Sequence, residues 1–365
     1  MGTMEDINLT SFPNALEEPW NYNYPNSSGW PSETYCDRIS DMHLYEKVIL
    51  PILYILVLLV GLTGNGLMLA VLLSCGRGSV RITEVYLMHL ALADLLLLCT
   101  LPFILISNIQ GWIFGSFLCK THHVFRNLSC HCGSVLLACI SFDRYIAIVH
   151  AVQHLGNRRP LSVHWICAVV WLVCLAFSVP NTMFYYVEEE FPNSTFLMCE
   201  LFGSDDHTSN WLFASRLIAH LCFFLPLVVM TYCYSAVVFT LCQRGTSREK
   251  QGAIRLAMII TIIFLFCWLP YNISLVTESL TIWNIIDLPC EALKLLDKVV
   301  VVSESIGYMH SCLNPILYAF LAVKFRRDLL RMLSRSPWLK RHLEADRISS
   351  LFTSTRATTT SNSYV

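Results

Sequence analysis

The sequence predicts an all-α membrane protein, a seven-transmembrane helix bundle with a short amphipathic helix after the seventh span. Apolar residues make up 55% of the 365 residues and charged residues only 14%, a balance that an ordinary soluble domain of this length does not show. Seven stretches are long enough to cross a hydrocarbon core, which takes about 20 predominantly apolar residues in a helix. Basic residues gather in alternate connections, as they do on the cytoplasmic side of membrane proteins.

The predicted spans differ in polarity. The first contains no charged residue, and the second is interrupted only by His89 and Asp94. The third carries Lys120 and Arg126, so we expect it to lie inside the bundle rather than against lipid. The predicted spans cover residues 48–76, 85–110, 117–142, 160–187, 217–243, 256–277 and 299–323.

Composition divides the chain into three parts. Residues 1–45 form a polar, acidic arm, residues 46–323 form the bundle, and residues 324–365 form the tail. Most Lys and Arg residues lie in the tail and in the connections after spans 1, 3 and 5, which predicts a cytoplasmic tail and an extracellular arm. The glycosylation acceptors Asn8, Asn26 and Asn193 fall on the outer side and support this orientation.

The tail contains two different segments. Residues 324–330 alternate basic and apolar side chains, which suits a short helix lying on the anionic lipid of the inner leaflet. Residues 349–363 are mostly Ser and Thr, and they predict a disordered segment open to phosphorylation.

The 16 cysteines do not form a disulfide scaffold of the secreted type, because most lie inside predicted spans and act there as small apolar residues. The exceptions lie at the outer face. They are Cys36, Cys119, Cys199 and Cys290. Four cysteines allow three pairings, and the sequence pattern alone does not choose among them.

The polar residues of the spans do not have the spacing of a metal site or of a nucleophile with its base, and no phosphate-binding loop is visible. Internal repeats, which are common in transporters, are also missing from the sequence. We therefore expect neither an intramembrane enzyme nor a transporter, and no metal or nucleic-acid partner.

Short motifs occur in, or directly at the end of, each of the seven predicted spans. Each one alone is a weak signal, but their order along the chain is specific. They are Gly64-Asn65, Leu90-Ala91-Leu92-Ala93-Asp94, Asp143-Arg144-Tyr145, Trp171, Pro226 with Tyr234, Cys267-Trp268-Leu269-Pro270 and Asn314-Pro315-Ile316-Leu317-Tyr318. With these motifs the whole bundle resembles the rhodopsin-like G-protein-coupled receptors.

A smaller set of residues narrows the resemblance to chemokine receptors of the CXC type. Segments 143–151 and 100–103 are similar to the chemokine-receptor versions of the third-span and second-span motifs. Trp112, Glu304 and the extra outer cysteines add to the likeness. The amino-acid sequences of segments 111–116, 138–142 and 307–310 are most similar to CXC types 3 and 5. The resemblance also implies the disulfide pairings Cys119–Cys199 and Cys36–Cys290.

The resemblance implies a switch on the cytoplasmic side of the bundle. Asp143 would restrain Arg144 in the resting state, and its release would let Arg144 meet a heterotrimeric G protein while Pro270 acts as a hinge. The residues that it assigns to this switch are Asp143, Arg144, Tyr145, Tyr234, Trp268, Pro270, Asn314, Pro315 and Tyr318.

Asp94 lies deep in a span, where an ionisable side chain is expensive and therefore predicts a function. The resemblance implies a polar core of Asn65, Asp94, Ser311 and Asn314 that holds a sodium ion as an allosteric modulator, with no other cofactor. Gly133 and His310 stand where many relatives have a hydroxyl side chain and an asparagine. These two departures leave open whether sodium binds.

Glu304 is expected to point into the upper part of the bundle, where it meets a basic ligand terminus or pairs internally with Arg126. The acidic arm is expected to attract a basic protein ligand, and its tyrosines are candidates for sulfation. The residues predicted to bind ligand are Glu304, Trp112, Arg126, Tyr271, Glu278, Tyr308, Tyr22, Tyr24 and Tyr35.

The resemblance implies a plasma-membrane receptor that transmits the binding of a CXC chemokine to an inhibitory-class G protein, driving calcium signalling and chemotaxis. Receptor kinases and arrestin would act at the Ser/Thr-rich tail. A scavenging chemokine receptor without G-protein coupling, or a receptor for another peptide, are the alternatives. The intact motif Asp143-Arg144-Tyr145 favours coupling.

Overall fold

The computed structural model describes residues 44–74, 82–150, 160–189, 195–201, 206–244, 248–321 and 323–335. All of these belong to the second of the two units into which the chain divides, Met1–Ile39 and Ser40–Val365. Several predictions fall on other parts of the chain. The predicted residues that lie outside the described ranges are Asn8, Tyr22, Tyr24, Asn26, Tyr35, Cys36, Asn193 and the Ser/Thr-rich segment 349–363.

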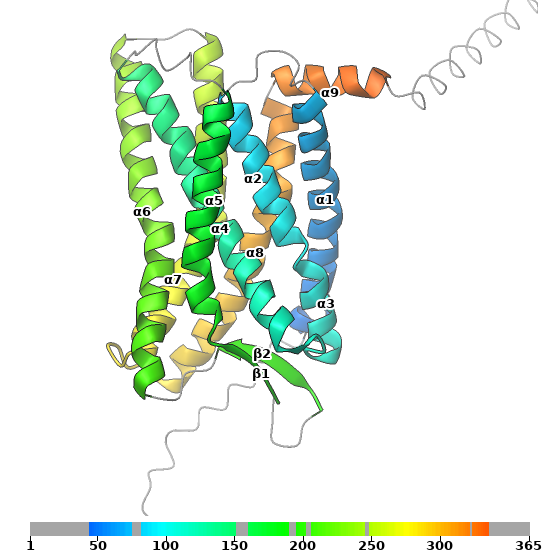
Figure 1. Ribbon diagram of the computed structural model, residues 1–365, viewed down its shortest axis with the longest axis vertical. Helices are drawn as coiled ribbons and strands as arrows, with labels where there is room; N and C mark the ends of the chain where they lie inside the picture. Colours follow the sequence, from blue (N-terminus) through cyan, green and yellow to red (C-terminus); the bar gives the residue numbers. More distant parts are fainter. Residues whose placement is uncertain are drawn as a thin grey trace, which may run out of the picture. The chain divides into compact units, whose positions relative to one another are not determined.

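The described elements form a helical bundle with one short β-hairpin at one end (Figure 1). The helices are η1 (Tyr45–Ile49), α1 (Leu50–Ser74), α2 (Ile82–Leu98), α3 (Leu101–Gln110), α4 (Gly115–Ile148), α5 (Pro160–Thr182), α6 (Asp206–Arg244), α7 (Arg248–Ile282), α8 (Cys290–Leu321) and α9 (Val323–Arg335). The hairpin strands β1 (Tyr185–Glu189) and β2 (Leu197–Leu201) pair antiparallel. The sequence predicted the helical bundle but not this hairpin.

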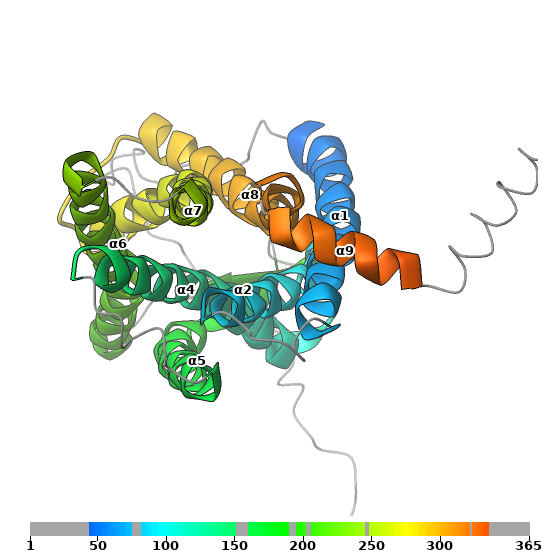
Figure 2. The ribbon, with the colours of Figure 1, turned by 90° about the horizontal axis from the view of Figure 1, so that it is seen from above.

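Helix α4 is the interior helix of the bundle. It contacts α2, α5, α6, α7 and β1, and the view along the bundle shows it between α2 and α6 (Figure 2). In its most apolar window 72% of the residues are buried, against at most 44% in the other five candidate spans. This position explains why the third span is more polar than its neighbours, because lipid does not surround it.

The second predicted span is two helices rather than one. Helix α2 ends at Leu98 and α3 starts at Leu101, next to Pro102, which has no N–H to continue a helical ladder. The Thr100 hydroxyl donates to the Leu97 carbonyl at 2.6 Å and closes the junction. The span therefore bends at residues 100–102, and its second part, α3, can take a direction of its own.

Six of the described helical segments are long and apolar enough to cross a membrane, whereas the sequence predicted seven. The remaining one, α8, has 32 residues, so length is not the reason. Several of its buried side chains are polar, including Ser305, His310, Ser311 and Asn314, each at most 3% exposed. A helix that turns polar groups toward the interior of a bundle has low average hydropathy without facing water.

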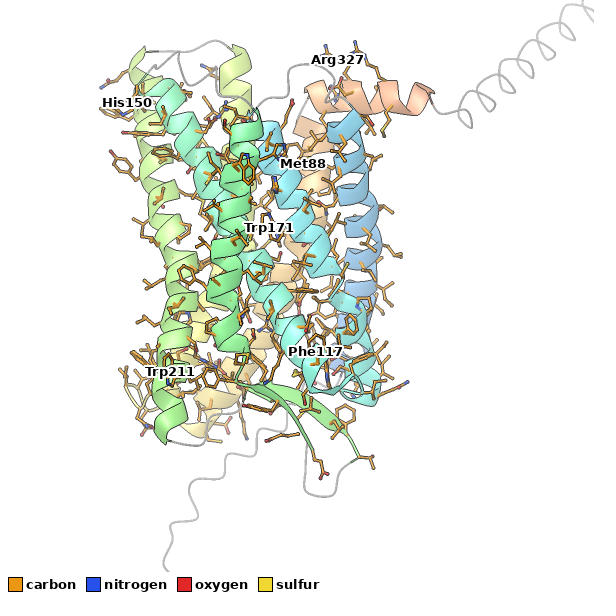
Figure 3. The ribbon with its side chains drawn as sticks, in the orientation of Figure 1. Met88, Phe117, His150, Trp171, Trp211 and Arg327 are labelled. Carbon is orange, nitrogen blue, oxygen red and sulfur yellow. A yellow bond between two sulfur atoms is a disulfide. The ribbon has the colours of Figure 1, made fainter. Side chains whose placement is uncertain are left out.

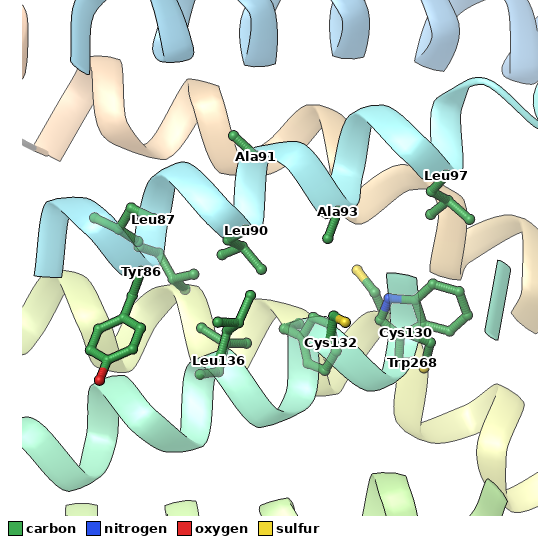
Figure 4. Packing of buried hydrophobic residues seen from close by; sticks show 14 of the residues in the cluster. Tyr86, Leu87, Leu90, Ala91, Ala93, Leu97, Cys130, Cys132, Leu136 and Trp268 are labelled. Carbon is green, nitrogen blue, oxygen red and sulfur yellow. The ribbon is translucent and has the colours of Figure 1, made fainter. Parts of the chain in front are cut away.

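The core is packed mainly between α2, α4 and α7. Leu90, Leu136 and Trp268 are at most 1% exposed, and Figure 4 shows Leu90 and Leu136 facing each other across α2 and α4. Cys132 is fully buried beside them and is a free thiol. The intramembrane cysteines of this helix thus serve as small core residues, as the sequence predicted.

The two ends of the bundle differ. At the hairpin end, called the sheet end below, Figure 3 shows Phe117 and Trp211. At the other end, called the α9 end, it shows His150 and Arg327. Helix α9 turns away from α8 and lies across the end of α1 (Figure 1), where the Phe325 ring packs 6.1 Å from that of Tyr318. The predicted short helix after the last span is confirmed.

Gly64 allows α1 to approach α8 closely. A Cβ atom at this position would lie 2.8 Å from Cβ and 2.9 Å from Cγ of Pro315. Because a proline ring cannot turn away, we expect Gly64→Ala to lower the free energy of unfolding by about 1–3 kcal/mol, the usual cost of overpacking. The apparent unfolding temperature of the purified protein measures this loss.

Gly66→Ala is the matched control, since a Cβ there meets nothing within 4 Å. Alanine favours a helix over glycine by about 1 kcal/mol, so this variant should be unchanged or slightly more stable. Equal losses in both variants would show that the approach of α1 to α8 is not tight at Gly64.

Candidate functional site

At the sheet end, an arginine of α4 and a glutamate of α8 form a buried ion pair. Arg126 Nη1 lies 2.5 Å from Glu304 Oε1, and the two side chains are 9% and 21% exposed. A lone charge in this position would be costly, and the pairing compensates both groups. Glu304 was expected either to meet a basic ligand terminus or to pair with Arg126, and the structure shows the pair with Arg126. The Glu304 side chain is the more exposed of the two partners.

Tyrosines surround this pair. Arg126 Nη2 donates to the Tyr185 hydroxyl of β1 at 3.5 Å, and its guanidinium lies 5.8 Å from the centre of the Tyr271 ring. Tyr308 is fully buried one turn beyond Glu304, and its hydroxyl lies 3.4 Å from Thr100 Oγ1. The predicted residues Arg126, Tyr271, Glu304 and Tyr308 are therefore brought together from α4, α7 and α8.

A second ion pair joins α6 and α7. Arg216 Nη1 lies 3.1 Å from Glu278 Oε2 and also donates to Ser279 Oγ at 3.0 Å. The Arg216 side chain is 8% exposed and that of Glu278 is 32% exposed. As in the first pair, the guanidinium is the more deeply buried partner and the carboxylate is the more accessible one.

The hairpin is fixed to the bundle beside the first of these pairs, since Tyr185 of β1 contacts Arg126. A disulfide joins Cys199 of β2 to Cys119 of α4, the pairing that the resemblance implies. The Trp112 backbone N–H donates to the Leu197 carbonyl at 2.6 Å, and its indole N–H donates to the Gly115 carbonyl at 2.9 Å. Trp112 is thus a buried support of the hairpin. Cys290 is also disulfide-bonded.

Halfway along the bundle, Asp94 of α2 faces α8. Asn314 Nδ2 donates to Asp94 Oδ2 at 2.8 Å, and His310 Nε2 lies 2.9 Å from Asp94 Oδ1. Asn65 Nδ2 donates to the Ser311 carbonyl at 2.7 Å. The predicted polar core is therefore assembled from α1, α2 and α8, with His310 as an additional member.

Trp268 of α7 reaches this polar core. Its indole Nε1 donates to His310 Nδ1 at 3.0 Å, and the Trp268 side chain is fully buried. Two residues further along, Pro270 lies inside α7, and Pro315 lies inside α8. Each proline removes one backbone donor from its helix, which permits a local bend.

At the α9 end, Arg144 is held by two groups. Its Nη2 donates to Asp143 Oδ2 at 2.6 Å and to Thr83 Oγ1 of α2 at 2.7 Å. The side chains of Arg144 and Asp143 are 23% and 15% exposed. A cation is therefore restrained next to the α9 end by one charged and one neutral partner.

Three tyrosines lie around the same end. The Tyr145 hydroxyl is 3.1 Å from His150 Nε2, and the Tyr234 hydroxyl is 3.2 Å from Thr261 Oγ1 of α7. Tyr318 is 4% exposed, and its hydroxyl is buried without a hydrogen-bond partner. A buried hydroxyl group without a hydrogen bond costs free energy. A movement that gave the Tyr318 hydroxyl a partner would therefore be favourable.

Comparison with known proteins identifies the family. Residues 64–318, well over half of the chain, match the family described as 7 transmembrane receptor (rhodopsin family). C-X-C chemokine receptor type 5 of Homo sapiens is 39% identical over 295 residues, which cover 80% of this chain and 79% of that receptor. C-X-C chemokine receptor type 1 of Homo sapiens is 36% identical over 347 residues, covering 94% and 97%. The chain belongs to the rhodopsin-family C-X-C chemokine receptors.

Membership in this family completes the architecture. The receptor is a multi-pass protein of the plasma membrane, and α8 is its seventh span. Its family is a class of receptors and not of enzymes. A type 5 receptor of Rattus norvegicus, 39% identical over 292 residues that cover 80% of this chain and 78% of the relative, fits the predicted subfamily.

Sequence reasoning missed several partners in this receptor. Arg216 escaped because the fifth span was predicted to begin at residue 217, whereas α6 starts at Asp206 and keeps Arg216 7% exposed. Thr83 and Tyr185 carry no distinctive signal, because hydroxyl side chains are common at helix ends and in hairpins. His310 was noted as an unusual residue, but its contacts with Asp94 and Trp268 depend on the fold.

Proposed function

We propose that this receptor binds a basic CXC chemokine at its sheet end and transmits the signal to an inhibitory-class G protein at its α9 end. The observation that carries the proposal is the form of the two sheet-end ion pairs. In both, the carboxylate is more exposed than the guanidinium, at 21% against 9% for Glu304 and Arg126 and at 32% against 8% for Glu278 and Arg216.

This asymmetry suits a cationic ligand. A basic chain terminus approaching the sheet end meets the carboxylates first and can share them with the arginines behind. The acidic arm, residues 1–45, supplies a first electrostatic attraction, and sulfation of Tyr22, Tyr24 and Tyr35 would strengthen it. The arm and the three glycosylation acceptors are extracellular in this orientation, and the tail is cytoplasmic.

Transmission uses the switch residues between the two ends. Ligand binding favours the state in which α7 bends at Pro270 and the Asp143 restraint on Arg144 is released. Tyr318 and Tyr234 then move inward, and Tyr318 finds the partner that it lacks in the resting state. The outcome is nucleotide exchange on the G protein, a calcium signal and chemotaxis, followed by phosphorylation of the tail by receptor kinases and binding of arrestin.

Nucleotide exchange and calcium release, measured on cells that express the receptor and are treated in turn with purified chemokines, test this function. Exchange in response to a basic CXC chemokine supports it. Internalisation of a bound chemokine without exchange would instead indicate a scavenging receptor. If no chemokine caused exchange or calcium release but an unrelated peptide did, the proposed ligand class would be rejected.

Glu304→Gln is expected to raise the concentration of chemokine needed for half-maximal exchange by at least about tenfold, because it removes one member of a buried charge pair at the ligand end. Potency is measured at equal surface expression. Glu291→Gln is the control, since it removes the same charge at the start of α8 from a side chain that is 88% exposed. Equal losses in both variants would mean that only overall charge matters.

A further inference from the structure

The carboxylate of Asp94 faces a nitrogen atom at each of its oxygens. Asn314 Nδ2 donates to Oδ2 at 2.8 Å, and His310 Nε2 lies 2.9 Å from Oδ1. The second contact has the separation of an ion pair, although the N–H direction is not that of a straight hydrogen bond. Asp94, His310 and Asn314 are at most 3% exposed. The Asp94 carboxyl group is therefore faced by protein groups in a buried site.

The other ring nitrogen of His310 faces two groups of opposite character. Trp268 Nε1 donates to His310 Nδ1 at 3.0 Å, while the Gly307 carbonyl oxygen lies 2.6 Å from the same atom. An indole N–H can only donate, so this bond requires a bare Nδ1 and puts the ring proton on Nε2. If Nδ1 instead carried the proton and donated to Gly307, the indole N–H of Trp268 would face a second donor, so the Trp268 contact favours the proton on Nε2. Nε2 then carries its proton on the side of Asp94, although the N–H does not point straight at Oδ1.

A sodium ion at Asp94 does not fit this arrangement. Each carboxylate oxygen already faces a protein nitrogen, and an ion at Oδ1 would meet the His310 Nε2 proton at close range, where positive groups repel in a low-dielectric interior. Three buried oxygens of the polar core, Asn65 Oδ1, Ser311 Oγ and Asp94 Oδ1 itself, have no hydrogen-bond partner and would suit a cation if His310 were absent. His310 is thus the residue that stands against sodium, while the remainder of the polar core could accept it.

The His310 ring is also held in place from its sides. Its centre lies 5.4 Å from that of Phe264 and 5.5 Å from that of Trp268, both in edge contacts. Phe264 and Trp268 are at most 1% exposed. Movement of these α7 side chains therefore changes the packing around the imidazole and couples α7 to the contact between His310 and Asp94.

We propose that the His310 imidazole, and not a sodium ion, is the resident partner of Asp94 in this receptor, and that it links Asp94 directly to Trp268. His310 is then a positioning residue. It replaces a diffusible cation by a covalently attached group, and it connects α2 and α8 to the bend in α7. Sodium concentration then does not regulate this receptor. A movement of Trp268 shifts His310 and so changes its contact with Asp94.

The claim that sodium does not bind at Asp94 can be tested with the purified full-length receptor in detergent, without chemokine or G protein. The apparent unfolding temperature is compared in sodium chloride and in choline chloride of equal concentration. The unchanged receptor is expected to give equal values. His310→Asn removes the imidazole and supplies an amide oxygen, so sodium should raise its unfolding temperature by at least about 2 °C at ten times the dissociation constant. Adding Asp94→Asn to this variant should remove the rise.

A sodium-specific rise in the unchanged receptor, abolished by Asp94→Asn, would overturn the proposal, and this measurement does not depend on whether any His310 variant folds. A His310→Asn variant that folds but ignores sodium would equally refute the claim that the imidazole excludes the ion. For the link to Trp268, the stability losses of Trp268→Phe and His310→Asn should be clearly less than additive in the double variant. Additive losses would show that the two residues act independently.

Discussion

Arg144→Ala is expected to abolish chemokine-driven nucleotide exchange on the G protein while chemokine binding at the sheet end is kept. Arg144 Nη2 donates to Asp143 and Thr83 at 2.6 and 2.7 Å, and the side chain is 23% exposed at the α9 end. Alanine removes the charge and all the donors of this side chain. Exchange by membranes with equal receptor density, together with labelled-chemokine binding to the same membranes, measures the separation of the two functions.

Asp143→Asn should have the opposite effect on the same switch. The substitution keeps the size of the side chain but weakens a charge-assisted hydrogen bond, which is worth about 1.5–3 kcal/mol in favourable cases. Because both partners are partly exposed, we expect the lower end and an increase of about tenfold in exchange without ligand. Thr83→Val should act in the same direction with a smaller effect. Normal exchange by Arg144→Ala would rule out Arg144 as the group that the G protein meets.

The helices could be predicted from the sequence because a membrane span has a strong compositional signal. The polarity of the third span even indicated its interior position, which the burial of α4 confirms. A bend in the second span could be predicted from Pro102, because proline cannot continue a helical ladder. The β-hairpin was not predicted, because a hairpin of 5-residue strands in a connection has no hydropathy pattern of its own.

For the candidate site, the sequence indicated ionisable residues but not their partners. Glu304 and Arg126 stood out because charges are rare in spans, and their pairing was one of two possibilities. Arg216 lay one residue outside the predicted fifth span, so its contact with Glu278 was invisible. His310 differs from the expected asparagine, yet only the three-dimensional structure places it between Asp94 and Trp268. Partner identity is a property of the helix packing.

Arg126→Leu is expected to lower the stability of the receptor by about 3–5 kcal/mol, the usual cost of removing one partner of a buried ion pair. The Glu304 carboxyl group would lose its partner, Arg126 Nη1 at 2.5 Å, in a site where its own side chain is only 21% exposed. The apparent unfolding temperature of the purified receptor should therefore fall by several degrees. Surface expression in cells should fall in parallel, because unfolded receptor is removed by quality control.

The double variant Arg126→Leu with Glu304→Gln distinguishes two causes of the lost stability. One is the loss of attraction between the two charges, and the other is the cost of a buried carboxylate without a partner. Once the carboxylate is neutral, most of the lost stability should return, because replacing both members of a buried pair is often nearly neutral. Arg216→Leu should cost less than Arg126→Leu, since Glu278 is 32% exposed and retains more hydration. If the double variant is no more stable than Arg126→Leu, the arginine supports the fold through its tyrosine contacts. If it is restored, the pair contributes little net stability, and its value to the receptor lies in holding Glu304 ready for a cationic ligand.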